Sequence, residues 1–289
     1  MKKFILKNIY FCLPLIFLFY AKPLYLLIGD KYKETVAGHE TYLSIQKSKQ
    51  KSKSKILIIG DSVGKQLFDN EKKSDSINSL ACNQAIGVIG QYLLLDNYLK
   101  TGNRPKIIYM VYSPTSFKNN LDQVFTYHYF LKPFFQKEYL GEFSRTAFRQ
   151  IDKIPYLELC HEPYVLTSNW APNYKNNDCI NYTFLSPITR EYLSKIKDLC
   201  ISHNIDFYII PTPTRESNKT MVKSFNKNEY LSCNFRKDLT VYLNDVIYLK
   251  DSCFIDGLHL KHPYLYKNLV NNLMAKARIH YPCKSSCGV

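Results

Sequence analysis

The stretch KILIIGDSVGKQLF, residues 55–68, decides how this chain is interpreted. Its run from Ile56 to Ile59 is short and wholly apolar, which is the pattern of a strand buried on both faces of a sheet. Gly60, Asp61 and Ser62 follow at the end of that strand, where a helix is expected to begin. A serine in this position is the first candidate functional residue.

The two glycines and the lysine of this stretch also suggest a nucleotide-binding loop. A P-loop requires G-x-x-x-x-G-K-[ST], in which the four intervening residues shape the turn around the phosphates and the hydroxyl binds Mg²⁺. Only three residues separate Gly60 from Gly64, and Gln66 stands where the hydroxyl should be. The spacing therefore argues against phosphate binding.

Gly60-x-Ser62-x-Gly64 also fits the nucleophile elbow of α/β-hydrolases. That elbow normally follows several strands, and a loop upstream of it supplies part of the oxyanion hole. The sequence before Lys55 contains no strand-forming run that would build such a loop. This interpretation is disfavoured as well.

Short apolar runs alternate with helical segments along the rest of the chain. This alternation predicts an α/β fold, a three-layer sandwich in which helices cover both faces of a central parallel sheet. The expected strands are 55–60, 106–112, 205–211 and 245–251, and the expected helices are 81–100, 187–204 and 263–277. Residues 113–186 interrupt the alternation with a segment rich in Tyr, Phe, Pro and Asn, which is typical of a lid or substrate-binding insertion.

The N-terminal 30 residues predict a membrane anchor. They include a predominantly apolar stretch of about 25 residues, in which Lys7 and Lys22 are the only charges. This stretch is long enough to span a bilayer. No small-residue cleavage site follows, so an uncleaved transmembrane helix over 1–30 is expected, with a buried N-terminal helix as the alternative. The lysine- and serine-rich residues 31–54 predict a flexible tether, and the domain is expected to cover 55–289, outside the cytoplasm.

Charge and cysteine content bound the remaining possibilities. The chain has 39 Lys and Arg against 24 Asp and Glu, but no arginine-rich aromatic stripe marks a nucleic-acid site, so no nucleic-acid partner is expected. Nine cysteines without any C-x-x-C pair argue against structural zinc, and neither a metal nor a cofactor is expected. The cysteines suit either disulfides, with Cys283 and Cys287 closing a small loop, or buried thiols.

A second motif near the end of the chain supplies what Ser62 lacks. A serine hydroxyl is a weak nucleophile until a histidine accepts its proton, and a carboxylate must orient that histidine. Asp256-Gly257-Leu258-His259 follows the last expected strand. At the carboxyl edge of a parallel sheet, this segment and Ser62 are expected to meet.

Gly60-Asp61-Ser62 after the first strand, paired with Asp256-x-x-His259 before the final helix, resembles the SGNH/GDSL hydrolase superfamily over residues 55–277. The resemblance implies Ser62 as the nucleophile, His259 as the general base and Asp256 as its orienting partner. It also implies oxyanion donors, of which the Ser62 N–H is the first. Gly87 is the best candidate for the second donor.

The third oxyanion donor of the family is an asparagine in a G-x-N-D block, and the sequence YSPTSFKNN departs from that block. Ser113, Asn119 and Asn120 remain as candidates for this position. Arg215 follows another expected strand end and is predicted to line the same crevice, where it would bind an anionic group of the substrate.

The predicted membrane anchor followed by an SGNH-like domain resembles the membrane-tethered members of this superfamily. These proteins transfer or remove O-acyl groups of cell-envelope polysaccharides. The resemblance implies a serine esterase or O-acyltransferase acting on an acylated carbohydrate, with acetyl as the expected acyl group and a membrane acyl-donor protein as a partner. The aromatic segment 113–186 would stack on sugar rings. The alternative is a non-catalytic glycan-binding or assembly protein that keeps the fold.

Overall fold

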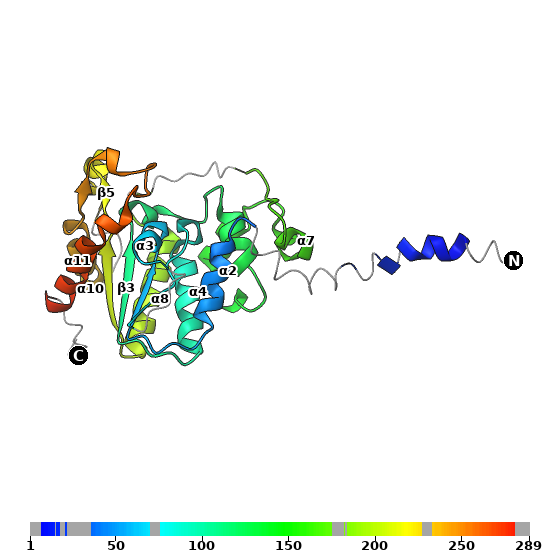
Figure 1. Cartoon of the computed structure of the whole chain (residues 1–289), viewed down its shortest axis with the longest axis horizontal. Helices are drawn as coiled ribbons and strands as arrows, with labels where there is room; N and C mark the ends of the chain where they lie inside the picture. Colours follow the sequence, from blue (N-terminus) through cyan, green and yellow to red (C-terminus); the bar gives the residue numbers. More distant parts are fainter. Residues whose placement is uncertain are drawn as a thin grey trace.

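The central sheet has four parallel strands in the order β2-β1-β3-β4 (Figure 1). The computed structural model describes residues 7–14, 16–17, 21, 36–69, 76–174, 182, 184–226 and 233–280. The strands are β1 (Ile56–Gly60), β2 (Ile77–Ser79), β3 (Ile107–Tyr112) and β4 (Asp206–Pro211). The predicted α/β class and the central parallel sheet are confirmed.

Helices cover both faces of this sheet, as expected for a three-layer sandwich. Side chains alternate between the faces along each strand. Leu57 and Ile59 of β1 enter one apolar core, and Ile58 enters the other. The first core is closed by α4 (Gly87–Lys100), α8 (Pro187–Ser202) and α10 (Cys233–Asn244), and the second by α3 (Ser62–Leu67) and α11 (Lys267–His280).

The segment after β3 is built of short helices that extend the first core. Large aromatic side chains such as Phe117, Tyr127, Phe130 and Phe134 are fully buried in it. The helices are η2 (Pro114–Lys118), η3 (Tyr127–Leu131), α5 (Lys132–Phe134), η4 (Leu140–Glu142), α6 (Arg145–Ile151), η5 (Leu157–His161) and α7 (Pro163–Leu166). Most of the aromatic content of the insertion therefore serves packing.

The predicted strand 245–251 does not join the central sheet. Only β6 (Tyr248–Leu249) forms there, and it pairs with β5 (Thr214–Arg215) in a separate sheet of two parallel strands. Pro211 and Pro213 have no N–H to donate, which ends the regular pairing of β4 and moves the next paired residue to Thr214. The remaining short helices are η1 (Gln84–Ile86), η6 (Glu216–Asn218), α9 (Lys219–Lys223), η7 (Asp251–Cys253) and η8 (Pro263–Leu265).

Residues 36–54 are part of the folded domain, which differs from the flexible tether predicted for 31–54. Helix α2 (His39–Ser48) buries Ile45 and small polar side chains against α4. Beyond it, Asn103 accepts a hydrogen bond from the Ser52 N–H at 2.8 Å and donates to the Gln50 carbonyl at 2.9 Å. Small serines allow close packing and the polar backbone finds partners, so a run without an apolar face still folds here.

The predicted anchor over 1–30 lies mostly outside the described residues, as do Cys179, Cys283 and Cys287. Within the described ranges, no helix is both long and apolar enough to cross a membrane. Cys82 and Cys160 are free thiols in the core, and Cys253 is a free, partly exposed thiol.

Candidate active site

Ser62, His259 and Asp256 lie in one hydrogen-bonded chain at the carboxyl edge of the sheet. The His259 Nε2 atom lies 2.9 Å from the Ser62 Oγ atom, and the His259 Nδ1 atom lies 2.8 Å from Asp256 Oδ2. Ser62 and His259 are 197 positions apart in the sequence, so only the fold brings them together. The motif pairing expected from the sequence is thus reproduced as geometry.

The local structure on both sides holds this arrangement. Ser62 is the first residue of α3, directly after β1. The segment carrying His259 is a loop closed by the isolated bridge between Phe254 and Leu260. Gln66 of α3 accepts a hydrogen bond from the Leu260 N–H at 3.0 Å, which links the segment that carries His259 to the helix that begins with Ser62. Gln66 is the residue at the position where a P-loop would have Ser or Thr.

The two carboxylate oxygens of Asp256 have different partners. Oδ1 accepts hydrogen bonds from the backbone N–H groups of Leu258 and His259, at 2.7 and 2.8 Å. Oδ2 faces the histidine ring. Partial burial acts in the opposite direction, yet the hydrogen bonds from His259 and Leu258 lower the pKa of Asp256 to about 2. The group is therefore an ionised acceptor at neutral pH.

An ionised Asp256 fixes the tautomer of His259. A carboxylate only accepts hydrogen bonds, so the proton of the neutral imidazole sits on Nδ1 and the lone pair of Nε2 points at Ser62. The Ser62 hydroxyl then donates to Nε2, which is the arrangement that general-base catalysis requires. The side chains of His259 and Asp256 are 32% and 53% exposed, so this chain of groups is open to solvent.

Asp61 supports the site from below and was assigned no function from the sequence. Its Oδ1 caps α3 by accepting from the N–H groups of Val63 and Gly64, and its Oδ2 accepts from the Ser113 N–H and the Ser116 hydroxyl, each at 2.7 Å. Complete burial raises the pKa of Asp61, and these four hydrogen bonds oppose that effect. Asp61 thus ties the serine helix to the loop after β3. An Asp before a helix start is a recognisable N-cap signal.

The spacing of Gly60 and Gly64 has a packing origin. A Cβ atom on Gly60 would lie 2.2 Å from the Val111 carbonyl oxygen, and one on Gly64 would lie 2.6 Å from the same atom. Both residues must be glycine for α3 and β1 to lie this close to β3. Gln91 completes the support, with its side-chain amide bonded to both the N–H and the C=O of Gly60.

The Ser62 N–H is the best-placed oxyanion donor. Within the described residues it donates no hydrogen bond, as expected at the first turn of a helix. Gly87, predicted as the second donor, does not fit: its N–H donates to the Gln84 carbonyl that ends η1. The turn that brings Gly87 to a φ of 61° also commits its N–H.

The two candidate asparagines hold loops together rather than a substrate. Asn119 donates to the Gln84 carbonyl at 2.6 Å and accepts from the Leu121 N–H at 2.8 Å. Asn120 donates to the Tyr182 hydroxyl and accepts from the Ile188 N–H. Both are buried, and one N–H of each side-chain amide is used in these contacts, so neither is identified as a donor to the oxyanion.

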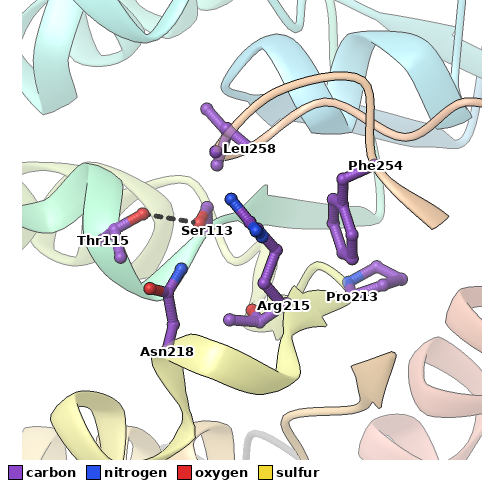
Figure 2. Close-up of a pocket in the computed structure, with 9 residues that line it drawn as sticks. Ser113, Thr115, Pro213, Arg215, Asn218, Phe254 and Leu258 are labelled. Atoms are coloured by element: carbon purple, nitrogen blue, oxygen red, sulfur yellow. Dashed lines mark hydrogen bonds between the residues drawn. The ribbon is translucent and has the colours of Figure 1, made fainter. Parts of the chain in front are cut away.

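Ser113 and Arg215 do line a common pocket. This pocket borders the loop that carries Asp256 and His259, here called the triad loop. Figure 2 shows their side chains facing this space, with the Ser113 hydroxyl bonded to Thr115 at 3.0 Å. The pocket is a shallow depression open to solvent, and it shares Gly257 and Leu258 with the loop between Asp256 and His259. Its other lining residues are Thr115, Pro213, Thr214, Asn218 and Phe254.

Arg215 is not a free cation in this pocket. Its Nη2 atom lies 2.6 Å from Asp251 Oδ2. The hydrogen bond from Arg215 lowers the pKa of Asp251 to about 2, so the pair is ionic at neutral pH. A paired guanidinium beside hydroxyl and amide groups, with Phe254 and Pro213 as an apolar wall, suits a neutral polar ligand better than the anionic group expected from the sequence.

Thr115, Asn218, Phe254 and Leu258 were not identified from the sequence. Leu258 is a variable position within the D-x-x-H segment, and the other three carry no motif signal beyond a position after the end of a strand or near that segment. Comparison of the sequence with protein-family models and with curated proteins finds no match.

Proposed function

We propose that this protein is a serine esterase or O-acyltransferase that acts on acyl groups of carbohydrate. The observation that carries the proposal is the Asp256–His259–Ser62 chain, with both contacts within hydrogen-bond distance and the tautomer fixed by an ionised carboxylate. This arrangement also supports the resemblance to SGNH/GDSL hydrolases. Three unrelated structural roles for these residues would not require the two hydrogen bonds in series.

The chemistry follows from the positions of these groups. His259 Nε2 takes the Ser62 proton as Oγ attacks the acyl carbonyl carbon, and the Ser62 N–H stabilises the oxyanion of the tetrahedral intermediate. The protonated His259 then gives its proton to the departing alkoxide, which leaves an acyl-Ser62 ester. In the second half, His259 removes a proton from water or from a sugar hydroxyl, which attacks the ester and releases Ser62.

The carbohydrate substrate follows from the resemblance, and the acceptor stays open. The pocket beside the triad loop presents the partly exposed polar side chains of Thr115, Arg215 and Asn218, whereas Ser113 and Phe254 are almost fully buried. The exposure of His259 admits water, so the isolated protein should act as an esterase. Transfer to a sugar then needs a partner that covers the site, consistent with the proposed membrane acyl-donor protein.

Acetyl release from 4-nitrophenyl acetate, with and without soluble oligosaccharides, tests this function. We expect release by the wild type, with a loss of about 10³-fold or more in Ser62→Ala and His259→Ala. Mass spectrometry of the sugars separates transfer from hydrolysis. Equal activity in wild type and both variants would refute the assignment.

The alternative is a glycan-binding protein that keeps the fold. The N–H of Gly87, which already donates to the Gln84 carbonyl, favours it, because the Ser62 N–H is then the one oxyanion donor identified among the described residues. Removing an oxyanion donor typically slows such enzymes by about 10²–10³-fold. Oligosaccharide binding without any acetyl release, unchanged in Ser62→Ala, would establish this alternative.

A further inference from the structure

Exposed apolar side chains gather on the insertion, outside the groups that line the candidate active site. Val124, Phe125, Tyr156 and Trp170, here called the aromatic patch, are 58%, 61%, 58% and 42% exposed. The rings of Tyr156 and Trp170 meet edge to face at 6.1 Å. The buried Tyr127 connects them from below, since its ring contacts Trp170 at 5.8 Å and its hydroxyl donates to the Tyr156 carbonyl at 3.0 Å.

This patch flanks the place where the chain enters the domain. On one side, the Ala37 N–H donates to Asn169 Oδ1 at 2.7 Å, one residue before Trp170. On the other side, a Cβ on Gly38 would lie 2.4 Å from the His128 carbonyl oxygen, and the ring of the next residue, Tyr129, packs against Phe125 at 6.3 Å. Residues 37–38 therefore contact both the segment that carries Phe125 and the segment that carries Trp170.

Tyr156 is held in an unfavourable backbone conformation while its ring remains exposed. Its φ of 57° lies in the left-handed region, which bulky side chains rarely adopt. The Tyr127 hydroxyl fixes this conformation from the core. Strain maintained at an exposed aromatic residue points to a surface with a binding role.

We propose that the aromatic patch lies in the headgroup region of the membrane that the N-terminal apolar stretch enters. That stretch ends at Ile28, and residues 29–35 separate it from the described domain. Seven residues reach at most about 25 Å when extended, so the bilayer surface cannot lie far from residues 37–38. Trp and Tyr favour the membrane–water interface because they are apolar bodies with a polar edge.

This proposal rests on the membrane anchor expected over residues 1–30 and is independent of Ser62 chemistry. The exposed charges beside Tyr156 have both signs, as in Lys153 and Glu158, so a zwitterionic lipid should suffice. Contact at this surface would fix the orientation of the domain on the membrane, rather than leave it hanging from a tether.

Trp170 is the only tryptophan of the chain, so its fluorescence reports on the patch alone. The test uses the full chain in phosphatidylcholine vesicles, first checked for co-flotation. Vesicles with lipid brominated near the headgroup or near the chain end then serve as quenchers. We expect a loss of Trp170 emission that is larger with the shallow bromines, together with weak quenching by acrylamide in the water.

A matched control moves the reporter to another face. Trp170→Phe combined with Tyr264→Trp places it in η8, just before α11, which Figure 1 shows on the opposite side of the domain from α7. Tyr264 is 71% exposed, and a tryptophan there should be insensitive to bromine. Emission of Trp170 unchanged by bromine, equal quenching at both positions, failure to float, or a response to soluble oligosaccharide alone would overturn the proposal.

Discussion

At the residue scale, the division of work between the two oxygens of Asp256 determines the state of His259. Two backbone N–H groups hold Oδ1, and the imidazole Nδ1 occupies Oδ2. The carboxylate is half-exposed, yet its position is fixed by its own loop. The proton-accepting nitrogen therefore faces Ser62 without any further residue.

The first prediction concerns Asp256→Asn. The Asn Oδ1 atom can still accept from Leu258 and His259, but its NH₂ group would face the imidazole and favour the tautomer with the proton on Nε2. That tautomer cannot accept the Ser62 proton, so kcat for ester hydrolysis should fall by about 10²–10⁴-fold with little change in KM. Steady-state kinetics measures this change. A kcat within threefold of wild type, which is a change of about 0.7 kcal/mol in the activation free energy, would contradict the assigned role.

The second prediction is a pH dependence of stability that arises from the same carboxyl. Its pKa falls from the ordinary 3.8 to about 2 on folding. A depressed folded-state pKa gives stability above the unfolded-state pKa, and that stability is lost as pH falls through the folded-state value. The difference in free energy of unfolding between wild type and Asp256→Asn should thus shrink as the pH falls from about 4 to about 2. Urea titrations across this range test it, and a constant difference would show that Asp256 does not gain its hydrogen bonds on folding.

The residues of the triad could be predicted from the sequence, but the oxyanion donors could not. Ser62, Asp256 and His259 belong to two short motifs placed at expected strand ends. Gly87 and Asn119 looked suitable by residue type, yet the Gly87 N–H and one N–H of the Asn119 amide donate to the Gln84 carbonyl. Which hydrogen bonds a group already makes is decided by tertiary structure, and a residue type does not reveal it.

At the scale of elements, the contact between α3 and β3 positions the nucleophile. The third prediction is that Gly64→Ala destabilises the protein by about 1–3 kcal/mol, since its Cβ would meet the Val111 carbonyl oxygen at 2.6 Å. Movement of α3 should also lower esterase activity. Gly141→Ala is the matched control because nothing lies within 4 Å of its Cβ. Chemical unfolding of both variants measures the difference, and equal stabilities would show that α3 tolerates a wider separation.

Long apolar runs predicted their elements, and short or polar ones did not. Strands β1, β3 and β4 formed where expected because each carries an apolar run, buried almost throughout in β1 and β3 and partly buried in β4. The sequence Ile77-Asn78-Ser79 of β2 is too short and polar to stand out, and its strand exists through pairing with β1. Helix α2 was likewise missed, because its buried face carries serine and threonine and has no apolar stripe.

At the scale of the whole molecule, residues 36–54 belong to the domain and bring the N-terminal side of the chain against its core. The fourth prediction is that a chain beginning at residue 55 is less stable than one beginning at residue 36 by at least about 2 kcal/mol. The loss reflects exposure of the α4 surface that α2 covers. Urea unfolding of the two truncated chains decides it, and equal midpoints would mean that this segment contributes no stability.

We propose that folding of the whole molecule converts Ser62 into an activated nucleophile. The most direct measurement is labelling of the full chain with a fluorophosphonate probe, which reacts only with activated serines, beside Ser62→Ala and His259→Ala. We expect one labelled residue, Ser62, in the wild type and no labelling in either variant. A folded wild type that stays unlabelled, or labelling that persists in His259→Ala at the wild-type rate, would contradict it.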